Sequence, residues 1–468
     1  MIDTFAIRCS ILRLAFSGKL SEQVEGDGSA TELLKRINSE RILSQTEDVP
    51  YEIPNSWAWV RIADLYKINP KVEADGSTYA AFIPMDRISG GFDRTFTYET
   101  QSWEQASKNH TRFSDGDVAF AKISPCFENR KSFIAQHLPN GIGGGTTELI
   151  ILRQPEMLPE YTYFLVLDQR FISTGSSSYK GIVGQQRVLS DVIKNYLVPV
   201  PPYAEQKRIV EKIEQAFSVL DAIDALQAQY ADNLAVLKGK LIDAAIQGKL
   251  TEQLPEDGTA EELYQLVQEE RHRQEAAGTI KAVELAPAIS DSEKPFSIPA
   301  SWKWTNLGNV SYIVRGGSPR PIKQYITTRE DGINWIKIGD VEKGGKYIYS
   351  THEKIIPEGE SKSRRVYPGD FLLTNSMSFG RPYISKIEGC IHDGWLLIHG
   401  LNGFDPDYLY YLLSSTYLYG QFTVKASGST VDNLNIDKVK AAIIPLPPLA
   451  EQKRIAQKID ELMPIFER

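Results

Sequence analysis

Cysteine and histidine are scarce in this chain of 468 residues. The three cysteines (Cys9, Cys126 and Cys390) are far apart and odd in number, and the six histidines show no metal-ligand spacing. We therefore expect neither a disulfide framework nor a metal site. Unpaired thiols are typical of the reducing cytoplasm, which is the predicted location.

Long apolar runs are also missing. No stretch approaches the roughly 18 apolar residues that indicate a membrane-spanning helix. The N-terminal segment MIDTFAIRCS lacks the basic and apolar regions of a signal peptide. We expect no membrane partner.

An excess of positive charge is the third absence. The chain has 52 Lys and Arg against 60 Asp and Glu, which gives a net charge of −8 and a pI of about 5.5. This balance argues against a simple nucleic-acid binder. With 42% hydrophobic and 24% charged residues, the composition is that of a folded protein, and the length predicts two to four domains.

Catalytic motifs are the fourth absence. Val200–Tyr203 (VPPY) resembles the NPPY motif of adenine-N6 methyltransferases, but Val200 replaces the Asn or Asp that holds the target amino group. The glycine run Gly141–Gly145 is too degenerate for a dinucleotide or methyl-donor loop, so we expect a turn there. Glu205 and its repeat Glu451 head predicted helices, which favours a structural role over a nuclease role. The chain is predicted to be no enzyme.

One long helix is the dominant element that the sequence does contain. Ala204–Leu250 has no proline, and its apolar residues alternate at spacings typical of a helix packed against another helix. At 1.5 Å per residue such a helix is roughly 65 Å long. The predicted seam consists of Ile209, Ile213, Ala216, Leu220, Ile223, Tyr230, Leu234, Leu237, Leu241 and Ala244, with Gln227 as a polar interruption.

Both ends of this helix recur at the ends of the chain. Pro199–Ile209 (PVPPYAEQKRI) recurs as Pro445–Ile455 (PLPPLAEQKRI), and Gln247–Leu263 matches Ser17–Leu33. Only residues 223–230 of the helix lack a counterpart. The first and last helices are therefore predicted to form a second rod against the first, with Ile7, Ile11 and Leu14 on the seam.

Two blocks of about 150 residues, rich in short strands, lie between the repeated helices. Each opens on the motif IPxSWxW, and strand-like runs follow in the same order. The predicted fold class is α+β, with two similar mixed α/β domains, long antiparallel coiled-coil helices between them and a pseudo-two-fold internal repeat. The predicted segments are the N-terminal helix and connection (1–50), the first domain (51–200), the central helix and linker (201–295), the second domain (296–446) and the C-terminal helix (447–468).

Both blocks carry basic and amide side chains in polar loops, and such side chains read base edges and hold phosphates. Ser301–Lys346 holds eight Lys and Arg against four acids. The candidate DNA contacts are Lys122, Arg130, Lys131, Lys180, Gln185, Gln186 and Arg187 in the first block, and Arg315, Arg320, Lys323 and Lys337 in the second.

Two divergent blocks, each closing on an AEQKRI helix, together with the repeated GKL turn, resemble the specificity subunit of Type I restriction-modification enzymes. Residues 316–341 and 372–384 (LLTNSMSFGRPYI) also resemble its target-recognition domain, which adds Asn375, Ser376 and Arg381 to the candidate contacts. In the first block, Ser124–Arg130 (SPCFENR) corresponds to SMSFGR without the glycine.

The resemblance implies a division of labour. Each block would read one half of a bipartite double-stranded DNA site, and the helices would set the spacing and dock two methyltransferase subunits. S-adenosylmethionine and ATP would be bound by partner subunits and not by this chain, and motor-nuclease restriction subunits would be possible partners. The alternative is a non-DNA scaffold with two divergent protein-binding domains, which salt dependence would distinguish. A stand-alone nuclease or methyltransferase is disfavoured by the missing motifs.

Overall fold

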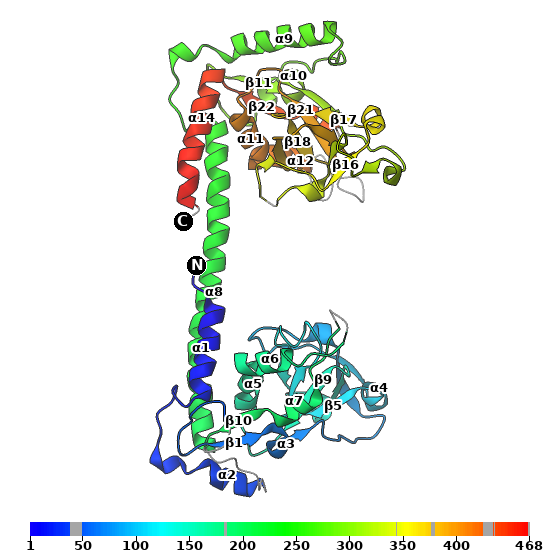
Figure 1. Cartoon of the computed structure of the whole chain (residues 1–468). Coiled ribbons are helices and arrows are strands. Elements are labelled where there is room, and N and C mark those ends of the chain that lie inside the picture. The colour runs from blue at the N-terminus through cyan, green and yellow to red at the C-terminus, as the bar shows by residue number, and fades with distance from the viewer. Residues whose placement is uncertain are drawn as a thin grey trace. The chain divides into compact units, whose positions relative to one another are not determined.

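The chain divides into two compact units, Met1–Gln229 and Tyr230–Arg468, shown in Figure 1. The computed structural model describes residues 1–37, 49–181, 185–342, 344–375, 380–424, 434 and 436–466. The division falls at the end of the stretch 223–230 that has no counterpart elsewhere in the sequence. Each unit therefore contains one block and one copy of each repeated motif.

The long helix is confirmed as α8 (Tyr203–Ile246), which has 44 residues. Pro201 and Pro202 end the preceding strand β10 (Leu197–Val200), and the helix starts directly after them. In the described part of the chain, no helix is long and apolar enough for a membrane span.

The first helix, α1 (Thr4–Phe16), lies antiparallel to α8 within the first unit (Figure 1). The Gln227 side chain donates to the Ile2 carbonyl at 3.2 Å, and Thr4 Oγ1 donates to Asp224 at 2.6 Å. One turn further along, Arg8 Nη2 donates to Asp221 at 2.8 Å. The prediction that the N-terminal helix packs on the long helix is confirmed for this unit.

The predicted seam is partly wrong. The buried face of α1 is formed by Thr4, Arg8, Leu12, Ala15 and Phe16, whereas Ile7 and Leu14 are 39% and 40% exposed. On α8, Tyr230 and Leu237 are also exposed. The reason is that α8 buries apolar residues against the domain as well as against α1, so one heptad stripe does not describe its contacts.

A glycine turn ends both α1 and α8. Gly18 and Gly248 have φ of 68° and 73°, the left-handed conformation expected from the GKL motif. Lys19 N donates to Leu14 O at 2.9 Å, and Lys249 N donates to Ala244 O at 3.1 Å. A Cβ on either glycine would clash with the proline of the following IPxSW motif, at 2.3 and 2.4 Å.

Two sheets and a helical layer build the domain of the first unit. Val118 and Phe120 of one central strand face the helices, whereas Ala119 faces the second sheet, so the first sheet is buried on both sides. The first sheet has the order β2 (Lys67–Ile68), β9 (Leu149–Arg153), β6 (Val118–Ala121), β7 (Ser132–Ile134), and the second has the order β4 (Glu99–Ser102), β3 (Tyr79–Ile83), β8 (Ile142–Gly145), β5 (Thr111–Ser114). The helices are α2 (Ala30–Arg36), α3 (Ile62–Leu65), α4 (Trp103–Ser107), α5 (Pro159–Leu167), α6 (Gln169–Ser176) and α7 (Ser190–Asn195).

The second unit repeats this topology and adds one edge strand to each sheet. Both units have one parallel strand pair in the second sheet, β3 with β8 and β14 with β20. The sheets have the orders β12 (Tyr312–Arg315), β21 (Trp395–His399), β18 (Phe371–Thr374), β19 (Pro382–Ser385), β15 (Tyr347–Ile348) and β13 (Ile326–Thr327), β16 (Glu353–Ile355), β14 (Ile333–Ile336), β20 (Gly389–Ile391), β17 (Arg364–Val366). The helices are α9 (Ala260–Ala276), α10 (Leu307–Val310), α11 (Pro406–Ser414), α12 (Thr416–Val424), α13 (Ile436–Lys440) and α14 (Leu449–Leu462). The predicted internal repeat is confirmed.

The glycine run Gly141–Gly145 is not the turn that the sequence predicted. Residues Ile142–Gly145 form the inner strand β8 of the second sheet. A Cβ on Gly144 would lie 1.8 Å from the Ala106 carbonyl oxygen, and one on Gly143 would overlap the Phe113 ring. The glycines are there because helix α4 and an aromatic ring approach this strand too closely for side chains.

A buried glutamate joins domain, turn and helix in each unit. Glu205 is 1% exposed and accepts hydrogen bonds from Ser21 Oγ at 2.9 Å, Gln23 Nε2 at 2.5 Å and Trp57 Nε1 at 2.8 Å. In the second unit Glu451, also 1% exposed, accepts from Thr251, Gln253 and Trp302 at 3.0, 2.7 and 2.8 Å. We call this arrangement the glutamate junction.

The glutamate junction connects three pieces that are far apart in sequence. Its tryptophan lies just before a two-stranded sheet, formed by β1 (Ala58–Arg61) with β10 in the first unit and by β11 (Lys303–Asn306) with β22 (Ile443–Leu446) in the second. Its serine or threonine and its glutamine follow the GKL turn. The structural role expected for Glu205 and Glu451 agrees with this arrangement.

Candidate nucleic-acid interface

Several of the candidate contacts of the first block come together at the end of strand β6. Lys122 N donates to Glu148 O at 2.8 Å, and Val188 N donates to Lys122 O at 2.9 Å. Arg187 forms β-bridges with both Ile123 and Lys180. The strand end thus gathers a basic and amide cluster from segments that are more than fifty residues apart: Lys122, Lys180, Gln185, Gln186 and Arg187.

This first cluster presents its polar side chains to solvent. Lys180, Gln185 and Arg187 are exposed, and Lys122 is half-buried. Arg187 Nε donates to both carboxylate oxygens of Glu148, at 3.1 and 3.0 Å, and Nη2 donates to Oε1 at 2.7 Å. This hydrogen bonding raises the pKa of Arg187 and fixes the plane of its guanidinium.

Arg130 lies apart from this cluster, inside the protein. It is 4% exposed, and its guanidinium donates to Leu167 O at 2.9 Å and to Gln169 Oε1 at 2.6 Å. The charge lies 4.8 Å from the centre of the Phe5 ring of α1, and burial lowers the pKa of Arg130. Arg130 therefore holds α1 to the domain, and its buried guanidinium is not accessible to DNA.

Lys131, the next residue, is half-buried, and its Nζ donates to Met85 O at 2.8 Å. The hydrogen bonds between neighbouring strands also correct the match of Ser124–Arg130 with SMSFGR that the sequence suggested. Ala121 N donates to Lys131 O, and at the same step of the second unit Thr374 N donates to Arg381 O. Lys131, and not Arg130, is therefore the counterpart of Arg381.

The candidate contacts of the second block gather around Asp393. Arg315 Nε donates to the Asp393 carbonyl at 3.0 Å, and Asn375 Nδ2 donates to the same oxygen at 2.9 Å. Arg320 Nη2 lies 3.3 Å from Asp393 Oδ2. Ser318 Oγ donates to Oδ1 at 2.7 Å, which holds the pKa of Asp393 below its usual range.

Two glycines allow this arrangement. A Cβ on Gly316 would lie 2.1 Å from the His392 carbonyl oxygen, and one on Gly317 would lie 2.8 Å from the Lys362 carbonyl oxygen. Gly316 N donates to Trp395 O at 2.9 Å, so the loop after β12 lies directly on the entry to β21. The GG of the loop is thus required for the contact with Asp393.

The other second-block candidates differ in exposure. Lys323 and Arg381 are exposed, whereas Asn375 is 3% exposed. Lys337 forms an ion pair with Glu353 at 2.9 Å. Ser376 lies outside the described residues.

The two clusters occupy the same topological place. β6 pairs with β9 so that Ala121 faces Leu149, and β18 pairs with β21 so that Thr374 faces Trp395. The next ladder bond is Lys122 N to Glu148 O in one unit and Asn375 N to Gly394 O in the other. Lys122 and Asn375 are therefore equivalent, and both clusters form where this central strand ends.

Sequence reasoning missed the acids that organise both clusters. Glu148 stands directly before the apolar run that becomes β9, and Asp393 is separated only by Gly394 from the run that becomes β21. Their positions before these strands were a usable signal, but a search for cationic contacts passes over carboxylates. Across the described residues, no three His, Cys, Asp or Glu side chains come together as a metal site would require.

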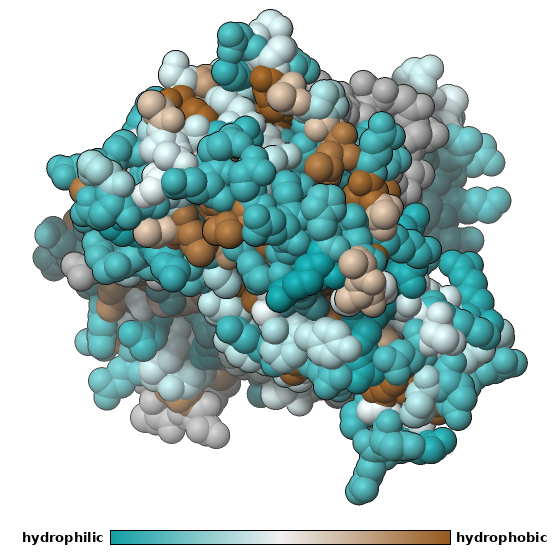
Figure 2. Space-filling model, turned by 90° about the horizontal axis from the view of Figure 1, so that it is seen from above, coloured by the Kyte–Doolittle hydropathy of each residue, from teal (hydrophilic) through white to brown (hydrophobic). Residues whose placement is uncertain are grey.

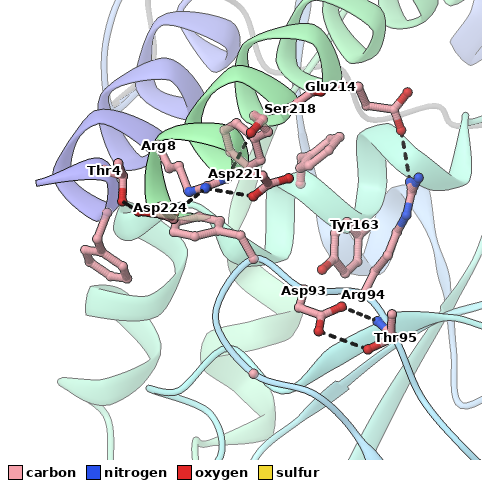
Figure 3. A pocket seen from close by; sticks show the side chains of 15 residues that line it. Thr4, Arg8, Asp93, Arg94, Thr95, Tyr163, Glu214, Ser218, Asp221 and Asp224 are labelled. Carbon is pink, nitrogen blue, oxygen red and sulfur yellow. Dashed lines mark hydrogen bonds and ion pairs between the residues drawn. The ribbon is translucent and has the colours of Figure 1, made fainter. Parts of the chain in front are cut away.

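A separate pocket of about 810 Å³ lies in the first unit between α1, α5, α8 and the loop 90–95. Figure 3 shows Arg8 between Asp221 and Asp224, and Arg94 reaching Glu214. Its lining has four carboxylates against two guanidiniums, so it does not favour a phosphate. The face in Figure 2 is mainly polar, with apolar residues in small separate groups.

The comparisons with known proteins agree with this geometry. The family model described as the Type I restriction modification DNA specificity domain matches residues 54–229 and 299–467, one match in each unit. The chain belongs to this family of DNA specificity subunits of Type I restriction-modification systems.

The specificity subunit of the Type I restriction enzyme EcoEI of Escherichia coli is 30% identical, over 100% of this chain and 91% of the relative. The EcoAI specificity subunit of the same organism is 29% identical, over 99% of this chain and 90% of the relative. A solved structure from work on complex assembly and conformational transition of the type I R-M system has a TM-score of 0.62 at 20% identity, over 89% of this chain and 93% of that one.

Proposed function

We propose that each unit reads one half of a bipartite DNA target and that the chain supplies the sequence specificity of a Type I complex. The observation that carries this proposal is the paired placement of the two clusters. Two units of the same topology each gather arginine and amide or lysine side chains where the central strand ends, with different residues in each. A common scaffold with different contact residues suits two different half-sites.

The chemistry would belong to partner subunits. We propose that two methyltransferase subunits dock on the helices and bind S-adenosylmethionine, and that restriction subunits, where present, use ATP. The chain itself would transfer no methyl group, since Val200 stands where the NPPY motif needs Asn or Asp, and Val200 is fully buried in strand β10. We place this work in the cytoplasm.

The acidic net charge is compatible with this proposal. Acids outside the two clusters need not contact DNA, and the partner subunits can supply phosphate contacts. A scaffold for protein ligands would not require the arginine and amide side chains that both units gather. For a chain that reads DNA, the specific affinity for its target should fall steeply with added salt, because phosphate contacts release counterions.

The test is reconstitution. The full chain would be combined with its methyltransferase subunits, labelled methyl donor and genomic DNA, and the modified sites would be mapped. The expected result is methylation at one interrupted motif, and no transfer by the chain alone. Transfer by the isolated chain, or methylation without a bipartite motif, would refute the proposal.

A further inference from the structure

In both units an acidic residue just before the strand that pairs with the central strand contacts arginines of the candidate cluster. Glu148 precedes β9 and holds Arg187 through three hydrogen bonds. Asp393 precedes β21, contacts Arg320 through its carboxylate and holds Arg315 through its carbonyl. The two acids lie one residue apart in the ladder, since Glu148 is equivalent to Gly394, the residue that follows Asp393.

The arginines reach this turn by different routes. Arg187 comes from the chain before α7, late in the first domain, whereas Arg315 and Arg320 come from the end of β12 and its loop, early in the second. These arginines occupy non-equivalent positions in the two units. The internal sequence repeat alone therefore does not account for an acid–arginine contact in both. A functional requirement for an acid–arginine contact at this position in both units explains the contact better.

Stability is a poor explanation for the pair of Asp393 and Arg320, whereas the Glu148 side chain of the other pair is only 20% exposed. The Arg320 side chain is 81% exposed and the Asp393 side chain 42% exposed, and exposed ion pairs contribute little to folding. What the pair does fix is direction. With Nη2 on Asp393, the other edge of the Arg320 guanidinium makes no hydrogen bond in the described part of the chain, and two adjacent donors are what a guanine edge accepts.

We propose that Glu148 and Asp393 are positioning residues for base readout, an inference that rests on the proposed function. Each carboxylate contacts one side of a guanidinium, and Arg187 Nη1 also donates to the Gln185 carbonyl at 3.4 Å, so that the donors that remain keep a fixed orientation toward the groove. Its negative charge also opposes unspecific attraction of the arginine to phosphates. Specificity is thereby gained at the cost of general affinity.

This role predicts effects of opposite sign, which structural damage would not produce. Asp393→Asn keeps an acceptor for Ser318 but removes the charge that faces Arg320. Binding to unrelated DNA should become stronger, and the slope of log affinity against log salt should steepen by about 0.9, the value for one added phosphate contact. Discrimination at one half-site should fall by about tenfold or more.

The experiment uses the full chain in complex with its methyltransferase subunits. After the target is mapped with the wild-type complex, affinity is measured over a salt series on the intact site, on sites with either half scrambled and on unrelated DNA. Glu148→Gln should affect one half-site and Asp393→Asn the other. Ser318→Ala, which frees the carboxylate without changing charge, should reduce discrimination with no change in salt slope.

Matched controls come from pairs outside the clusters. Asp331→Asn also frees an arginine, since Arg329 Nε donates to Asp331 at 2.9 Å. Glu99→Gln does the same for Arg87 in the first unit, where Nη2 donates at 2.6 Å. Neither control should change discrimination at a half-site.

The outcomes separate clearly. Unchanged discrimination, or a parallel loss of specific and unspecific binding at both half-sites, would overturn the positioning role. A wild-type complex that does not discriminate between intact and scrambled sites would instead refute the proposed function itself, before any variant is measured.

Discussion

Replacement of the glutamate of one junction should destabilise one unit and leave the other unchanged. Glu205 is 1% exposed and accepts three hydrogen bonds, one from the Trp57 indole. In Glu205→Gln the side chain keeps its volume, but an NH₂ group replaces one of the two oxygens. At least one buried donor then faces another donor and loses its partner.

The cost can be worked out from these contacts. A hydrogen bond to a charged group contributes about 1.5–3 kcal/mol, and a buried unpaired donor adds a further penalty. We therefore expect the free energy of unfolding of the first unit to fall by about 2–4 kcal/mol. For a unit of this size each kcal/mol corresponds to about 2–4 °C, so the melting transition should fall by roughly 4–16 °C.

Calorimetry combined with hydrogen exchange would measure this effect. Exchange should become faster in β1, in β10 and in the first turn of α8, and should not change in β11, β22 or α14. Glu451→Gln should give the reciprocal pattern. Glu211→Gln is the matched control, because Glu211 carries the same charge on the same helix but is exposed, and its effect should stay within about 0.5 kcal/mol.

A double-mutant cycle tests the hydrogen bond between the Trp57 indole and Glu205. If Trp57 and Glu205 interact as described, the double variant should lose less free energy of unfolding than the sum of the losses in Trp57→Phe and Glu205→Gln. The difference, the coupling free energy, should be about 0.5–3 kcal/mol. Additive effects, or equal loss of protection in both units, would refute the reasoning.

The remaining predictions concern recognition, assembly and pH. Replacing Ser56–Val198 by the equivalent block of a relative should change one half-site in the mapped methylation motif, and a change in both halves would show that the blocks are coupled. Arg381→Ala should cost about 1–3 kcal/mol of discrimination if the exposed side chain reads a base, whereas uniform weakening on all sequences would assign it to phosphate. A fragment of residues 1–229 keeps one domain, α1 and the first part of α8, and its helices carry Phe5, Leu14, Val219 and Leu226, which are exposed in the full chain as well and offer apolar surface for self-association. It should form a two-fold dimer by sedimentation, with a palindromic methylation motif; a monomer would contradict this. Hydrogen bonds from Arg208 lower the pKa of Asp27, so this pair stabilises the first unit above the ordinary aspartate pKa, and the contribution is lost as pH falls through the lowered value. Asp27→Asn should accordingly lower the melting temperature near neutral pH and leave it unchanged in strong acid.

Much of the fold could be predicted because local signals agreed with the repeat. The predicted N-terminal helix is α1, and the strand-like runs predicted for the second block include β21. Glycines after the helices, prolines before α8 and alternating apolar residues each act locally. Finding them twice in the same order made the two-domain architecture predictable.

What failed depended on contacts between distant segments. Heptad counting could not show that Phe217 of α8 packs on Phe92 and Phe164 of the domain, with ring centres 5.3 and 5.6 Å away. The burial of Arg130 needs Phe5, which is far away in sequence. The strand Ile142–Gly145 has few side chains from which a pattern could be read.

The candidate site was predictable in its cations and amides but not in its acids. Lys122, Lys180 and Arg187 meet as a group because strand pairing joins their segments, and no sequence pattern reports that pairing. Asp393 is an ordinary acid in the sequence, and only the approach of Gly316 to the chain before β21 makes it the centre of a cluster.

None of the residues 221–241 of α8 is buried, and the division between the units falls within this stretch. A genetic crossover there would join the front of one gene to the back of another without interrupting a sheet, a glutamate junction or an apolar core. Most hybrid proteins would then fold, and each would pair two recognition domains that had never been combined. Recombination at this single place could therefore produce new DNA specificities faster than point mutation of the contact residues.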